Sequence, residues 1–171
     1  MLIEKYLFIA LVGAAFLTTL WAAVSDWRSL KIPNYISLII IAIYPAVVLL
    51  SPVQIPWISG LMVAAVVFGV GFLLFVLGSF GGGDVKLLVA LSLWAGQDKI
   101  FPFLVAVVLA GGVLVLVLLI KEAFFGADGL TKRGRIKAAL RAKMPIPYGV
   151  AIAAGSLVIF GSYAGISENF G

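Results

Sequence analysis

Residues 101–120 read FPFLVAVVLAGGVLVLVLLI and contain no charged side chain. A helix needs about 20 apolar residues to cross about 30 Å of hydrocarbon, so this stretch predicts a membrane-spanning helix. Five other apolar stretches accompany it, at residues 6–24, 35–50, 57–77, 85–96 and 148–164. The stretch 85–96 is the short one, because its twelve residues would rise only about 18 Å as a helix. We therefore expect an all-α polytopic membrane helix bundle with about six transmembrane helices.

The composition points to an integral membrane protein with one domain. Of the 171 residues, 64% are hydrophobic and 11% are charged, whereas soluble proteins average about 45–50% and about 25%. No polar stretch is longer than the roughly 25 residues before the last apolar segment, so we expect residues 1–171 to form a single transmembrane domain. The first apolar segment lacks a clear small-residue cleavage site and is followed by Asp26 and Arg28. It is therefore predicted to be a retained span rather than a signal peptide.

The chain contains no cysteine and no histidine. This composition excludes a disulfide framework, a zinc site with cysteine ligands and a thiol nucleophile. It also excludes catalytic triads that depend on histidine, and it removes the commonest metal ligand. We expect no metal and no cofactor, so acid–base chemistry would fall to the seven acidic residues, to lysine or to tyrosine.

The distribution of Lys and Arg orients the predicted bundle. With six alternating spans, ten of the twelve basic residues fall on one face, leaving Lys5 and Lys99 on the other. The positive-inside rule makes the basic face cytoplasmic and places both termini outside. The basic loop at residues 121–143 is expected to lie in solvent or beside anionic lipid headgroups, with a substrate-docking surface as the alternative. We expect the protein to contact membrane lipid and to bind no nucleic acid.

The stretch GGGDVKLL at residues 81–88 places a carboxylate between two hydrophobic runs. An ionisable residue inside a membrane segment is rare and usually functional. The three glycines favour a break in the helix, and we expect a new helix to begin at or just after Asp84. The alternative is that Asp84 only caps this helix, since an acid in the first turn accepts backbone N–H bonds and faces the positive end of the dipole.

A second acid is predicted at the same depth. Asp26 ends the first apolar segment and Asp84 begins the fourth, so both fall at the cytoplasmic edge. Two facing carboxylates can hydrolyse an amide: the ionised one takes a proton from water, and the protonated one supplies a proton to the carbonyl oxygen. Two like charges in one site cannot easily both ionise, which separates these two roles.

Three motifs together resemble the type IV prepilin peptidases. SDWR at residues 25–28, followed by KIPN at 31–34, is similar to the first aspartate motif of that family. GGGDVKLL at 81–88 is similar to its Gly-x-Gly-Asp motif, and IPYG at 146–149 to its closing motif. The motifs occur in the family's order at the ends of predicted spans, and the resemblance covers about residues 6–164.

The resemblance implies a hydrolase of pilus biogenesis, an aspartic endopeptidase with Asp26 and Asp84 as its catalytic pair. Its substrate would be a prepilin with a short leader and a following hydrophobic helix, cleaved at the cytoplasmic edge of the bacterial or archaeal cytoplasmic membrane. Longer relatives carry an N-terminal segment, often with paired cysteines, that accompanies methylation. This chain lacks both and resembles the short form that serves tight-adherence (Flp-type) pili, so we do not expect methyltransferase activity.

Supporting roles are expected for other motif residues. The glycines before Asp84 would give the substrate backbone room. Arg28 and Lys86 would orient a carboxylate or, equally, anchor lipid headgroups. Pro33 would occupy the first helical position of the second span, and Asn34 would cap that helix or bond backbone or substrate. The full set of expected binding or supporting residues is Arg28, Pro33, Asn34, Gly81, Gly83, Lys86, Pro147 and Gly149.

Two other functions fit some of the same residues. One is an intramembrane aspartyl protease of the signal-peptide-peptidase or presenilin type, which usually has a Tyr-Asp motif in mid-span, whereas Asp26 follows Ser25 at the end of a span. The other is a small proton- or cation-coupled transporter that uses the same aspartates. A transporter predicts acids deeper in the spans and often an internal repeat, and neither is visible in the sequence.

Overall fold

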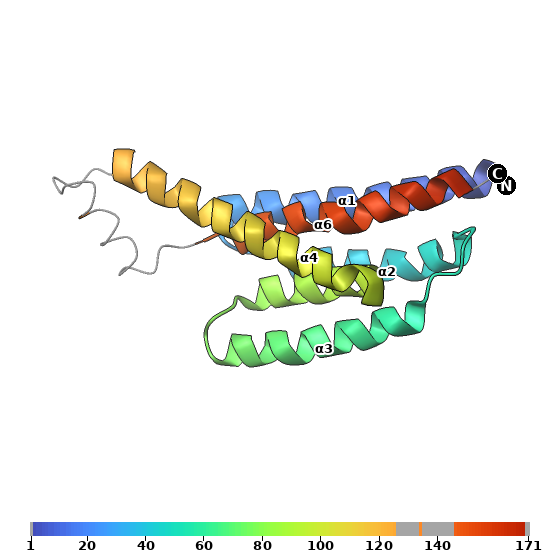
Figure 1. The fold of residues 1–171 in the computed structure, drawn as a ribbon, viewed down its shortest axis with the longest axis horizontal. Helices are drawn as coiled ribbons and strands as arrows, with labels where there is room; N and C mark the ends of the chain where they lie inside the picture. Colours follow the sequence, from blue (N-terminus) through green and yellow to red (C-terminus); the bar gives the residue numbers. More distant parts are fainter. Residues whose placement is uncertain (1, 126–133, 135–145, 170–171) are drawn as a thin grey trace.

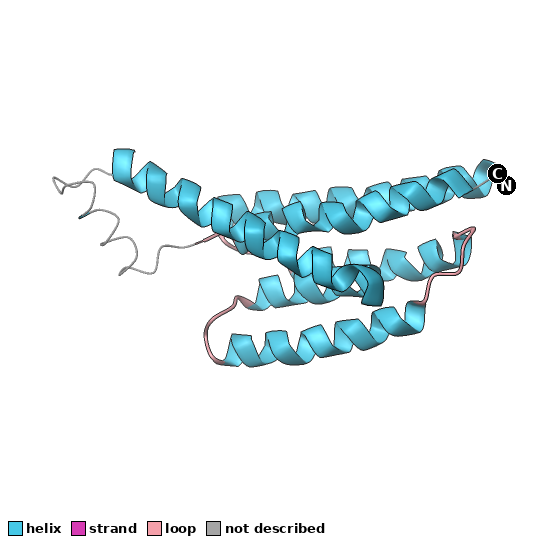
Figure 2. Ribbon diagram, viewed as in Figure 1, coloured by secondary structure: helices cyan, strands magenta, loops and turns pink. Residues whose placement is uncertain are grey.

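The computed structural model describes residues 2–125, 134 and 146–169. In this part of the chain every regular element is a helix (Figures 1 and 2), which confirms the all-α prediction. The elements are α1 (Leu2–Ser29), α2 (Asn34–Leu50), α3 (Trp57–Val76), α4 (Gly82–Phe125), α6 (Tyr148–Ile166) and the short 3-10 helix η1 (Ser167–Asn169). Among the described residues, four helices (α1, α3, α4 and α6 with η1) are long and apolar enough to cross a membrane, and α2 is a shorter apolar helix.

The predicted fourth and fifth segments are the two halves of α4. Gly96 interrupts this helix with a non-helical backbone, φ 55° and ψ −167°, a left-handed conformation that favours glycine. After this kink the chain turns back and crosses the bundle toward the end at which α4 began (Figure 1). The first half, residues 82–95, therefore rises only about 21 Å, as expected for the shortest segment.

Two helix boundaries differ from the prediction. The helix α4 begins at Gly82, two residues before Asp84, because the glycines at 82 and 83 are themselves helical. Its second half continues to Phe125, so Lys121 and Glu122 belong to a helix rather than to the predicted basic loop. The remainder of that loop, residues 126–143, lies outside the described residues apart from residue 134.

An aromatic cluster around Trp94 fixes the first half of α4 in the core. The indole Nε1 of Trp94 donates a hydrogen bond to the backbone oxygen of Ile40 in α2 at 3.0 Å. The hydroxyl of Tyr163 in α6 donates to the backbone oxygen of Trp94 at 3.1 Å. The rings of Tyr44 and Phe160 pack against the indole, each with centroids 5.5 Å away. Three helices are thereby joined near the kink, and the direction of α4 toward Asp84 is set.

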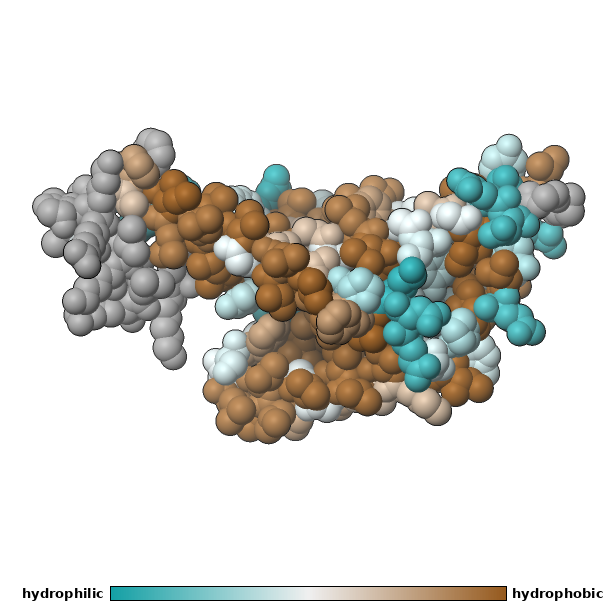
Figure 3. Space-filling view, viewed as in Figure 1, coloured by the Kyte–Doolittle hydropathy of each residue, from teal (hydrophilic) through white to brown (hydrophobic). Residues whose placement is uncertain are grey.

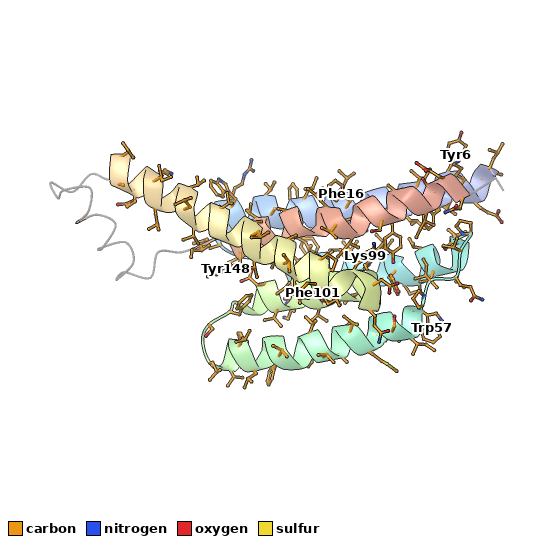
Figure 4. All side chains as sticks on the ribbon, in the orientation of Figure 1. Tyr6, Phe16, Trp57, Lys99, Phe101 and Tyr148 are labelled. Atoms are coloured by element: carbon orange, nitrogen blue, oxygen red, sulfur yellow. The ribbon has the colours of Figure 1, made fainter. Side chains whose placement is uncertain are left out.

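The outer surface of the bundle is largely apolar, as Figure 3 shows for one face. Both chain ends lie at the same end of the bundle (Figure 1), as an even number of crossings requires. Tyr6 and Trp57 also lie toward this end (Figure 4) and are 67% and 50% exposed. Aromatic residues of this kind are common at membrane–water interfaces.

Candidate active site

The structure brings Asp26 and Asp84 to one cavity at the end of the bundle opposite the termini. Asp26 lies in the last turns of α1 and is buried, with 5% of its surface exposed. Asp84 lies in the first turn of α4 and is partly buried. Both line a cavity of about 460 Å³ whose other walls are residues 30–34 and 81–83. The carboxylates come from positions 26 and 84, and packing places them in the same site.

Asp26 is held by the start of α6. The backbone N–H of Gly149 donates a 2.6 Å hydrogen bond to Oδ2 of Asp26. Gly149 is the second residue of α6, where backbone N–H groups have no partner within the helix. The Asp26 carboxylate therefore caps α6 from another helix, at the end where the helix dipole favours a negative charge.

This contact requires a glycine at position 149. A Cβ atom there would lie 2.9 Å from Cβ of Asp26, 2.9 Å from Cδ1 of Ile32 and 3.0 Å from Oδ2 of Asp26. Carbon atoms in good contact are about 3.5–4.0 Å apart. A glycine is thus expected to be needed at position 149 for the close approach of α6 to α1, which brings its N–H group to Asp26.

The side chain of Asp84 lies over its own helix terminus. A Cβ atom added at Gly81, the residue that precedes the first helical residue of α4, would lie 2.7 Å from Oδ2 of Asp84. An acid three residues after the helix cap that reaches back to the cap is one half of a capping box. Asp84 therefore lies where a capping acid would lie, and at the same time it lines the shared cavity.

The turn after α1, residues 30–34, forms one wall of the cavity. Leu30 adopts a positive φ of 53°, which costs a residue with a side chain about 1–2 kcal/mol. The hydroxyl of Ser25 donates a 2.8 Å hydrogen bond to the backbone oxygen of Lys31 and holds this turn. Ile32 then packs against Gly83, where an added Cβ would lie 3.0 Å from Cβ of Ile32. Leu30 and Ile32 were not among the expected site residues, although both fall within or beside the first motif.

The other expected site residues lie at different distances from the cavity. Asn34 lines it, and its Oδ1 accepts a 2.8 Å hydrogen bond from Nζ of Lys86, so its side chain joins α2 to α4 and does not cap α2. Pro33 is the residue before the first helical residue of α2, one position earlier than predicted. Arg28 is exposed and does not line the cavity.

The closing motif packs against the glycine loop. Pro147 is buried immediately before α6. Next to it, the ring of Tyr148 stacks on the ring of Phe80, with centroids 5.5 Å apart and an interplanar angle of 19°; Tyr148 lies near the start of α6 in Figure 4. Tyr148 thus supports the loop that carries Gly81, and Phe80 is a site neighbour that the sequence analysis did not select.

Comparison with known proteins gives the family. The model of the type IV leader peptidase family matches residues 9–118, which include both aspartates of the cavity. The chain belongs to the type IV leader peptidase family. This membership confirms the resemblance found in the motifs and, with the apolar helices, an integral membrane protein.

One curated relative of this chain is the prepilin leader peptidase/N-methyltransferase of Bacillus subtilis. The two are 30% identical over 144 residues, covering 81% of this chain and 50% of the relative. The chain thus spans about half the length of that relative. No solved structure gives a significant match. The family match ends before the closing motif, so the contact between Gly149 and Asp26 is an observation from the structure alone.

Proposed function

We propose that residues 1–171 form a single membrane-embedded aspartic endopeptidase that removes the leader peptide of prepilin-like substrates. The observation that carries this proposal is that Asp26 and Asp84, from two motifs of a leader peptidase family, line one cavity. The substrate class follows the family and the curated relative, which is a prepilin leader peptidase.

In the proposed reaction the two carboxylates hold different protonation states. The ionised carboxylate takes a proton from a water molecule as that water attacks the scissile carbonyl carbon. The protonated carboxylic acid donates to the carbonyl oxygen, and a proton is then delivered to the leaving amine as the C–N bond breaks. The Asp26 carboxylate accepts one backbone hydrogen bond, and both carboxylates have further lone pairs that can accept from water or substrate.

The position of the cavity supports cleavage at a membrane surface. The site lies at the ends of α1 and α4, where the turns at residues 30–34 and 81–83 line the cavity. Water is needed for hydrolysis, and a helix terminus near the surface receives it more readily than the bilayer centre. We propose that this is the cytoplasmic edge of the cytoplasmic membrane, because Arg28, Lys31 and Lys86 lie at this end and cytoplasmic loops carry an excess of Lys and Arg. A Flp-type pilin is the proposed substrate subclass.

The decisive experiment is cleavage of a short prepilin with a Gly cleavage site, in reconstituted membranes, read by product mass. Asp26→Asn and Asp84→Asn are expected to be folded and inactive. Asp98→Asn is the matched control, because Asp98 is exposed and lies beside the kink of α4, away from the cavity. Near-normal activity in either cavity variant would refute the aspartate pair.

Glutamate substitutions test how closely the two carboxylates must be positioned for cleavage. Asp26→Glu and Asp84→Glu keep the charge but lengthen the side chain by one methylene. A peptidase that needs close geometry should lose cleavage with both, because misplacing a catalytic group by about 1 Å costs on the order of 100-fold in rate. If cleavage survives in both, the strict geometry assumed for the pair is wrong.

A further inference from the structure

A second cavity of about 490 Å³ lies between α3 and α4, on the face toward the membrane. Its walls are the side of α3 and the second half of α4, and the first half of α4 contributes Leu88. Among the described residues that line it, Gln97 is the only polar one. In Figure 3 the surface between these helices is hydrophobic. We call this cavity the α3–α4 groove, and the lining residues that carry the argument are Met62, Val66, Leu74, Phe80 and Val108.

The kink at Gly96 produces the α3–α4 groove. Beyond the kink, the second half of α4 runs diagonally away from α3, so the two helices diverge toward the end that carries Asp84 (Figure 1). The wall residues remain open to the surroundings: Val66 of α3 is 66% exposed and Val108 of α4 is 72% exposed. The groove is therefore open laterally, where the bilayer would be.

The α3–α4 groove is continuous with the catalytic cavity along the chain. Phe80 lines the groove, and the next four residues, 81–84, line the cavity that contains Asp26 and Asp84. Phe80 also stacks on Tyr148, the residue before the Gly149 that binds Asp26. Phe80, at one end of the apolar groove, is thus followed directly in the chain by the residues that line the catalytic cavity.

We propose that the α3–α4 groove binds the hydrophobic helix of the substrate and delivers the preceding segment to Asp26 and Asp84. The proposal rests on the proposed function and identifies where its substrate docks. In hydrocarbon, backbone polar groups must be satisfied within the segment, so a chain lying in this groove is helical. Its backbone becomes extended, and thus open to attack, only where the groove ends at Phe80.

The size of the groove fits one face of a helix. From Met62 to Leu74 the α3 wall covers twelve residue steps, which is about 18 Å of helix. A helix about 10 Å across and about 18 Å long occupies about 1,400 Å³, roughly three times the volume of the groove. The groove therefore accommodates a stripe of side chains from the substrate helix, and the rest of that helix faces lipid.

Cross-linking tests the location directly, because the chain contains no cysteine and any introduced one is unique. Val66→Cys and Val108→Cys are each paired with a prepilin that carries one cysteine at successive positions of its hydrophobic helix. Asp84→Asn is included so that the substrate stays uncut. Leu17→Cys on α1 is the matched control, since Leu17 is also 66% exposed but lies outside the groove. Disulfides at both groove positions, on one face of the substrate helix, are expected.

Kinetics gives an independent readout. Val66→Trp should fill the α3–α4 groove and raise KM for the full prepilin at least about tenfold. It should leave kcat/KM unchanged for a peptide that contains the leader junction but no hydrophobic helix. Leu17→Trp should change neither value.

The outcomes separate the two proposals. If the wild type does not cleave prepilin, the proposed function fails. If it cleaves, but the groove variants cross-link and turn over as the Leu17 variants do, the substrate helix binds elsewhere and lipid occupies the groove. That result overturns the inference and leaves the peptidase intact.

Discussion

Replacing Gly149 by alanine tests the contact that holds Asp26. The added Cβ would lie 2.9 Å from Cβ of Asp26, closer than a favourable contact by about 0.6–1.1 Å. The start of α6 must move away from α1, and the 2.6 Å hydrogen bond to Asp26 is weakened or lost. Hydrogen bonds to charged groups contribute about 1.5–3 kcal/mol, so we expect kcat/KM for prepilin to fall about 10- to 150-fold.

The assay is steady-state cleavage in proteoliposomes, with thermal unfolding in detergent measured in parallel. Gly161→Ala is the matched control, because Gly161 lies in the same helix and an added Cβ would have nothing within 4 Å. That control should keep wild-type activity and equal or greater stability, since alanine is preferred to glycine inside a helix. If Gly149→Ala retains activity within about threefold of the control, the Asp26 carboxylate does not depend on α6.

Four further substitutions test two hydrogen bonds and the kink of α4. Lys86→Met and Asn34→Ala, combined in a double-mutant cycle, should show a coupling of about 0.5–1 kcal/mol in kcat/KM because their hydrogen bond is exposed; strictly additive effects would mean that this bond does not support the site. Gly96→Ala should lower stability by about 1–2 kcal/mol, measured as a lower unfolding midpoint, because alanine disfavours the positive φ of the kink; an unchanged midpoint would show that the kink is not strained. Trp94→Phe removes the hydrogen bond from α4 to α2 and should cost about 1 kcal/mol in the same measurement, whereas a stability equal to wild type would count against that bond.

The prediction of the fold came from local composition. The segment at 101–120 is apolar over the length that a bilayer requires, and the same argument placed the other spans to within a few residues. The errors occurred where the local signal was ambiguous. Glycines at 82 and 83 favour a break by propensity, yet they are helical here, where Gly83 packs closely against Ile32 and the Asp84 side chain lies over Gly81.

The candidate site was predicted in part. Asp26 and Asp84 stand out because a carboxylate at the end of an apolar run is unusual. Phe80 does not stand out, since an aromatic residue beside a hydrophobic segment is ordinary and its stacking on Tyr148 depends on a residue far along the chain. Asn34 was expected to cap α2 or bind backbone or substrate, and its actual partner, Lys86, is 52 positions away.

The sequence alone determined that the chain is a bundle of apolar helices with two acids at one depth, because the length of an apolar run and the position of a charge are local properties. Only the tertiary structure decided how the acids are held and what surrounds them. The bond between Gly149 and Asp26 joins residues 123 positions apart. The α3–α4 groove exists because the kink at Gly96 turns half of α4 away from α3. The first feature depends on packing between distant segments and the second on the direction that the kink gives to half of α4 in space, and a local pattern of apolar and charged residues encodes neither.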